Sequence, residues 1–123
     1  MAFAVAGIDH VEVFVRDLDN AARWYKEVLG LEEVGRWDPE PVMIGAGGTK
    51  LALFKAESDR PQAAEGLHWH RVAWKTDRAG FAAAQKHLAG LGIEFRGPVD
   101  HQRSHSIYFQ DPDGHRLEIT CYL

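Results

Sequence analysis

The stretch IDHVEVFVRDLDNAARWYKEVLG, residues 8–30, contains a strand pattern followed directly by a helix pattern. Side chains in residues 8–15 alternate between two faces, with Ile8, His10, Glu12 and Phe14 on one and Val11, Val13 and Val15 on the other. Asp17 then has the chemistry of a helix cap, apolar residues recur at helical spacing as far as Leu29, and Gly30 is a stop signal. Residues 8–30 therefore predict a half-buried strand and an amphipathic helix.

The same order of patterns begins again in the second half of the chain. RVAWKT, residues 71–76, predicts a strand, Asp77 a helix cap, and an apolar stripe from Phe81 to Leu91 predicts a helix that ends at Gly92. Three short strands are expected after each helix, at residues 32–37, 41–45 and 50–55 and at 94–97, 106–110 and 116–122. The fold class is thus α+β, with two βαβββ modules. We place module 1 at about 6–56, a polar linker at about 57–67 and module 2 at about 68–123, all within one domain over residues 1–123.

Composition excludes several classes of protein. The chain has 123 residues, 46% of them hydrophobic, and a net charge of −4. It has no cluster of Lys and Arg, so we expect no nucleic-acid partner, and no apolar run long enough to cross a membrane. Residues 1–7 make a poor signal peptide, and the single Cys121 fits a reducing compartment. We expect a cytoplasmic protein.

The duplicated unit, together with SIYFQDPDGHRLEIT at residues 106–120, resembles the vicinal oxygen chelate superfamily. This superfamily includes glyoxalase I, extradiol dioxygenases, methylmalonyl-CoA epimerase, fosfomycin-resistance thiol transferases and bleomycin-binding proteins. The resemblance implies that the two modules curl into a sheet cup around a divalent metal. It places His10 at the first ligand position and Glu118 at the last. The reaction is not fixed by the fold, because one scaffold hosts several.

The residues themselves support both candidate ligands. On the last strand Glu118 lies between Leu117 and Ile119, which face the core, and a carboxylate in such a place is costly to bury unless it is paired or binds a metal. His10 lies mid-strand among aliphatic residues in the same way. The structural alternatives are a Glu118 that faces solvent or an arginine, and a His10 that is a hydrogen-bonded core residue.

The resemblance aligns the superfamily's fourth ligand with Ala52, which cannot coordinate a metal. This removes the four-ligand site of glyoxalase I and leaves an arrangement of two histidines and one carboxylate, with His70 as the second histidine. Such a site keeps open positions for substrate. Histidine and glutamate accept Fe, Mn, Ni or Zn, so the sequence does not identify the metal.

The assignment of His70 conflicts with strand alternation. The closest match to the superfamily motif at the start of the second half is RVAW, residues 71–74, which directs Arg71 into the cup and His70 the other way. A bulge near Trp69 could turn His70 inward. Alternatively Arg71 replaces the histidine and binds an anionic or carbonyl ligand, since a guanidinium donates only. In a third alternative another histidine, such as His105 or His101, completes the site.

Further residues are candidates for catalysis or substrate binding. Tyr108, ten residues before Glu118, is a candidate donor to substrate oxygen, and the loop residues His101 and His105 are candidate acids or bases. Glu12 shares the face of His10 and is a candidate general base. Trp74 and Phe54 are candidates for an aromatic wall, although aromatic residues at strand spacing more often belong to the core.

Three functions remain open. The first is a metal-dependent enzyme most like an extradiol dioxygenase. The second is a lyase or transferase of the glyoxalase or fosfomycin-resistance type, against which stand Ala52, the lack of a lysine in the loop before Tyr108 and a chain that stops five residues after Glu118. The third is a metal-free, drug-sequestering or regulatory protein that binds its ligand through Arg71. In each case we expect a small-molecule ligand and a homodimer that covers the sheet edges.

Overall fold

The computed structural model describes residues 3–57 and 68–123, in two compact units, Met1–Arg60 and Pro61–Leu123. Each unit contains one helix and one four-stranded sheet. The predicted α+β class and the repeated βαβββ order are therefore confirmed. Most of the predicted linker lies outside the described residues.

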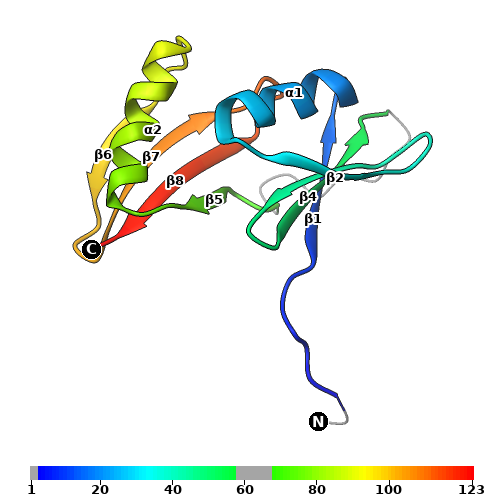
Figure 1. Cartoon of the computed structure of the whole chain (residues 1–123), viewed down its shortest axis with the longest axis horizontal. Coiled ribbons are helices and arrows are strands. Elements are labelled where there is room, and N and C mark those ends of the chain that lie inside the picture. The colour runs from blue at the N-terminus through cyan, green and yellow to red at the C-terminus, as the bar shows by residue number, and fades with distance from the viewer. Residues whose placement is uncertain (1–2, 58–67) are drawn as a thin grey trace. The chain divides into compact units, whose positions relative to one another are not determined.

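Unit 1 places its helix against one face of a mixed sheet (Figure 1). The strands have the order β1-β4-β3-β2, and β1 and β4 are parallel whereas the other pairs are antiparallel. The elements are β1 (His10–Val15), α1 (Leu18–Leu29), β2 (Glu32–Arg36), β3 (Val42–Ala46) and β4 (Thr49–Lys55).

Unit 2 repeats this arrangement, with the strand order β5-β8-β7-β6 and a parallel pair β5 and β8 (Figure 1). Helix α2 packs on β8. The elements are β5 (Val72–Lys75), α2 (Arg78–Gly90), β6 (Arg96–Asp100), β7 (Ser104–Gln110) and β8 (Arg116–Tyr122).

Both helices begin where the sequence predicts. The Asp17 carboxylate accepts a hydrogen bond from the backbone N–H of Asn20 at 2.8 Å, and the Asp77 carboxylate accepts one from Gly80 at 2.7 Å. Helix α1 ends at Gly30, whose φ of 70° is left-handed, as predicted. Helix α2 ends at Gly90, slightly before Gly92, where the sequence predicted its end. The backbone N–H of the C-cap residue Leu91 donates to carbonyl oxygens of the last turn.

The alternation predicted for the strands determines which side chains form each core. In β8 Leu117, Ile119 and Cys121 are buried beside α2, which contributes Phe81 and Leu88. In unit 1 the buried strand residues on the helix face include Val15, Val42, Ile44, Leu51 and Leu53. Glu118 in unit 2 and His10 in unit 1 each lie on the face of their own sheet that is opposite the helix. None of the described helices is long and apolar enough to cross a membrane.

Candidate functional site

Glu118 is held in place on the face of its sheet opposite α2. It is half-buried, and its Oε2 accepts a hydrogen bond of 2.6 Å from the hydroxyl of Ser106. Ser106 is fully buried and also lies 3.1 Å from the hydroxyl of Thr120. A carboxylate bound by a buried donor has a restricted orientation. Glu118 is therefore pre-positioned by its own sheet.

Tyr108 lies next to Glu118 on the neighbouring strand, since the two are register partners in β7 and β8. The Tyr108 hydroxyl is 2.6 Å from Nε2 of His101, which is a short hydrogen bond. His105 instead lies with its ring 6.4 Å from that of Phe81 of α2. The sequence could not choose between the two loop histidines, and the structure brings His101 alone of the two to Tyr108.

Arg71, and not His70, lies with Tyr108. Strand β5 pairs with β8 from Val72 to Lys75 without a register shift, and Trp69 and His70, where the bulge was predicted, precede the strand. Arg71 comes directly before β5, and its guanidinium carbon Cζ lies 4.2 Å from the centre of the Tyr108 ring. Its Nε is buried and has no hydrogen-bond partner. His70 is exposed, and its Nδ1 lies 3.3 Å from a guanidinium nitrogen of Arg116.

Trp74 does not join this group. It is the register partner of Ile119, which is buried on the helix face. The Trp74 indole nitrogen is buried and has no hydrogen-bond partner. The structure thus places Trp74 with the core side of β5.

In unit 1 His10 is bracketed by two carboxylates. Its Nδ1 is 2.8 Å from Asp9 and its Nε2 is 3.0 Å from Glu12. Hydrogen bonds to Asp9 and then Glu12 raise the pKa of His10 above its usual value. The bond to His10, and a second one from Lys50 at 3.1 Å, lower the pKa of Asp9. The two carboxylates therefore stabilise the imidazolium form of His10 relative to the neutral form.

Glu12 and Phe54 line a small pocket in unit 1. Phe14 of β1 and Phe54 of β4 are register partners, and Glu12 lies two residues before Phe14 on the same face. A pocket of about 250 Å³ is lined by Glu12, Val13, Phe14 and Phe54. The predicted base and one predicted aromatic contact are therefore neighbours.

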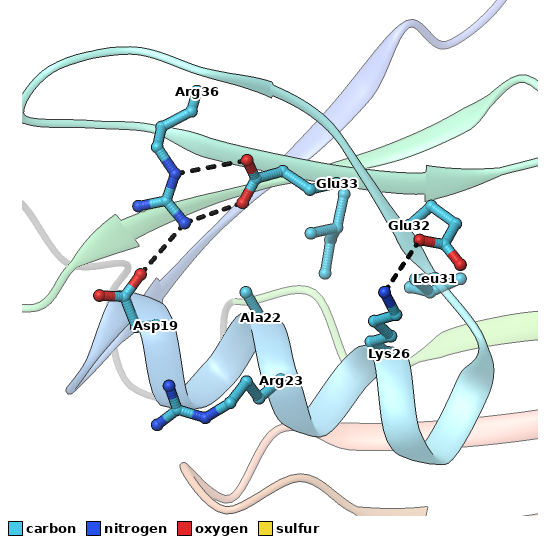
Figure 2. A pocket seen from close by; sticks show the side chains of 9 residues that line it. Asp19, Ala22, Arg23, Lys26, Leu31, Glu32, Glu33 and Arg36 are labelled. Atoms are coloured by element: carbon cyan, nitrogen blue, oxygen red, sulfur yellow. Dashed lines mark hydrogen bonds and ion pairs between the residues drawn. The ribbon is translucent and has the colours of Figure 1, made fainter.

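A larger pocket of about 350 Å³ lies between α1 and β2 (Figure 2). Its charged side chains pair with each other: Arg36 contacts Asp19 at 3.1 Å and Glu33 at 2.8 Å, and Lys26 contacts Glu32 at 3.4 Å. The pairs Arg36–Asp19 and Lys26–Glu32 join the helix to the strand, and the pair Arg36–Glu33 lies within β2. The pocket contains none of the residues predicted from the sequence to be functional.

A family model described as the Glyoxalase/Bleomycin resistance protein/Dioxygenase superfamily matches residues 7–119 of the chain. The chain belongs to this superfamily. The vicinal oxygen chelate resemblance is thereby confirmed, and the two βαβββ units match it.

Curated relatives include a fosfomycin resistance protein and a metallothiol transferase. The fosfomycin resistance protein FosX of Mesorhizobium japonicum is 28% identical, over 94% of this chain and 85% of its own. The metallothiol transferase FosB of Shouchella clausii is 29% identical, over 94% of this chain and 80% of its own. Among solved structures, the lactoylglutathione lyase of Agrobacterium tumefaciens has a TM-score of 0.77 and 25% identity, and covers 95% of this chain and 94% of its own.

A metal centre is implied by the superfamily, and the imidazole of His10 and the carboxylate of Glu118 have suitable donor chemistry. The two residues lie in different units, and His70 contacts Arg116. Among the residues that the structure describes, no three His, Cys, Asp or Glu side chains gather into a group that could hold a metal ion. The described residues around Glu118 therefore do not form a metal centre by themselves.

Two residues of this face were not among the predicted functional residues. Ser106 supplies the hydrogen bond to Glu118, and its shared parity with Tyr108 was a usable signal. Arg96 places its Cζ 4.5 Å from the centre of the Tyr108 ring. Its position follows from the pairing of β6 with β7, which the sequence does not specify.

Proposed function

We propose that this chain is an enzyme of the glyoxalase or fosfomycin-resistance type, a lyase or transferase that acts on a small oxygen-rich molecule. The observation that carries the proposal is the 2.6 Å hydrogen bond between Tyr108 and His101, beside Glu118 and Arg71 on one sheet face. These groups supply a proton donor, its partner base, a fixed carboxylate and a cation. We define this set as the Tyr108 site.

The chemistry of the Tyr108 site is proton transfer at a substrate oxygen. The Tyr108 hydroxyl donates a proton to a substrate oxygen when a bond to that oxygen breaks or its charge builds up, and His101 returns a proton to the phenol oxygen. Arg71 donates hydrogen bonds to negatively charged oxygens of the substrate, because a guanidinium presents several fixed donors. Glu118, held by Ser106, accepts a proton or hydrogen bond from the attacking group.

The relatives favour this function over the extradiol dioxygenase that we expected first. FosX is named for fosfomycin resistance, and FosB is named as a metallothiol transferase. The solved relative of Agrobacterium tumefaciens is named as a lyase of a glutathione adduct. Two of these names refer to a thiol or its adduct, which supports a lyase or transferase.

We further propose a divalent metal for this chain. His10 and Glu118 are the residues that would hold a divalent ion, with Fe, Mn, Ni or Zn as the choices, and the ion would act as a Lewis acid toward a substrate oxygen. His70 stays the predicted third ligand. We also propose that Glu12 acts as a base beside Phe54, that the two modules form one domain and that the chain pairs as a homodimer.

Turnover with candidate substrates tests the proposed function. Purified protein would be incubated with fosfomycin and glutathione, and separately with the hemithioacetal of methylglyoxal and glutathione, with and without each metal. We expect one pair to give a product by mass spectrometry, and Tyr108→Phe to lower kcat about 100-fold. Tyr122→Phe is the matched control, because Tyr122 is 67% exposed at the end of β8. An equal loss in both variants, or no turnover under any condition, would contradict the proposal.

A further inference from the structure

A bulge in β6 determines which face of the sheet the following loop reaches. Arg96 and Val99 are both paired with β7, and the two residues between them oppose only one residue there. The bulge includes Gly97, whose φ of +115° is a conformation that glycine tolerates and other residues do not. Because register partners share a face, Arg96 and Val99 both lie on the face of Tyr108, which regular alternation along β6 would not allow.

The altered alternation brings His101 to Tyr108. His101 lies two residues after Val99, and its backbone N–H donates a hydrogen bond of 2.9 Å to the carbonyl oxygen of Ser104 in β7. Its side chain is therefore on the face of Tyr108, where Nε2 lies 2.6 Å from the phenol oxygen. Regular alternation starting from Arg96 would instead direct His101 to the helix side of the sheet.

Asp100 holds the backbone of the turn that contains His101. Its Oδ1 accepts a hydrogen bond of 2.7 Å from the backbone N–H of Gln102. Gln102 has a left-handed φ of 73°, which is unfavourable for a residue other than glycine and is supported here by this local bond. The same carboxylate oxygen lies 3.7 Å from Nε2 of His105, and the Asp100 side chain is 73% exposed. The contacts of Asp100 therefore serve the turn and not the packing of the core.

We propose that Asp100 is a positioning residue that holds His101 against the hydroxyl of Tyr108. His101 is exposed, and an exposed side chain on a loosely held turn populates several rotamers. Without the bond from Asp100, the strained backbone at Gln102 relaxes and the hydrogen bond between His101 and Tyr108 is formed less often. The inference rests on the proposed function only for its effect on turnover, because the hydrogen bond itself is a property of the folded chain.

The test is an NMR double-mutant cycle on the full chain in EDTA, read at the imidazole Nε2 of His101. In the wild-type background Tyr108→Phe removes the hydroxyl and should shift this resonance. In the Asp100→Ala background the same substitution should produce a shift smaller by about twofold or more. Asp100→Asn keeps the Oδ1 acceptor and should retain the full shift, which separates support of the turn from the charge near His105. Arg103→Ala is the matched control, because it changes a side chain of the same turn and leaves the backbone hydrogen bonds of that residue in place.

An undiminished shift in Asp100→Ala, or a His101 resonance that Tyr108→Phe leaves unchanged in the wild type, would overturn the proposal. If circular dichroism shows that Asp100→Ala does not fold, Asp100→Thr keeps a weaker acceptor and should give an intermediate shift. With a substrate pair that turns over, Asp100→Ala should lower kcat about tenfold at unchanged KM, and Asp100→Asn should restore it. Failure of the proposed function alone would look different: the shift would still depend on Asp100, and no substrate pair would turn over.

Discussion

Replacing Ser106 with alanine tests whether the Glu118 carboxylate is held by its own sheet. The side chain of Ser106 is fully buried, and its hydroxyl donates the 2.6 Å hydrogen bond to Oε2 of Glu118. Hydrogen bonds to charged groups contribute about 1.5–3 kcal/mol, and the loss of one oxygen leaves only a small cavity. Since Glu118 is half-buried, we expect a loss of about 2 kcal/mol in the free energy of unfolding.

Thermal unfolding followed by circular dichroism measures this loss. For a chain of this length each kcal/mol lowers Tm by about 4 °C, so Ser106→Ala should melt about 8 °C below the wild type. Ser104→Ala on the same strand is the matched control, and its Tm should change by no more than about 2 °C. A double-mutant cycle with Glu118→Gln should give a coupling energy of about 1–2 kcal/mol. A coupling near zero would show that Ser106 does not hold the carboxylate.

Three further predictions concern the caps, the charges and a glycine. Asp77→Ala removes the cap of α2 and should cost about 1 kcal/mol, as measured by urea unfolding. Asp9→Asn should lower the pKa of His10 in an NMR titration in EDTA, because Asp9 is the main cause of its elevation. A His10 pKa that the substitution leaves unchanged would contradict this cause. In the wild type, the stabilisation that protonated His10 gains from the carboxylates should be full below about pH 6.5, the pKa of histidine in the unfolded chain. It should disappear as the pH rises through the higher pKa of His10 in the folded protein. Gly97→Ala should destabilise by about 3 kcal/mol, because φ is +115° and the new Cβ would lie 2.7 Å from a carbonyl oxygen of β7, whereas Gly90→Ala meets open space and should be tolerated.

Local patterns were sufficient to predict most of the fold. Helix α1 runs from Leu18 to the stop at Gly30 as expected, because both its cap and its apolar stripe are read directly from the sequence. Strand β8 likewise has the predicted bounds, and its alternation places Glu118 opposite the core. Strand parity also anticipated that Arg71 rather than His70 shares the face of Tyr108.

The composition of the candidate site depended on pairing between strands, which local patterns do not encode. The choice between His101 and His105 required the path of the loop before β7, which brings one ring to Tyr108 and the other to Phe81. Arg96 reaches Tyr108 only because the two are register partners, and the register of β6 and β7 includes an irregularity between Arg96 and Val99. A site of this kind cannot be assembled from residue spacing alone.

Locating the substrate on the protein tests whether the Tyr108 site is where it binds. Backbone amide NMR spectra would be recorded during a titration with fosfomycin, once in EDTA and once with added Zn²⁺. We expect the largest shifts to cluster at Arg71, Arg96, Tyr108 and Glu118. Shifts that cluster instead around Asp19 in the pocket of Figure 2, or no shifts at saturating ligand, would contradict it.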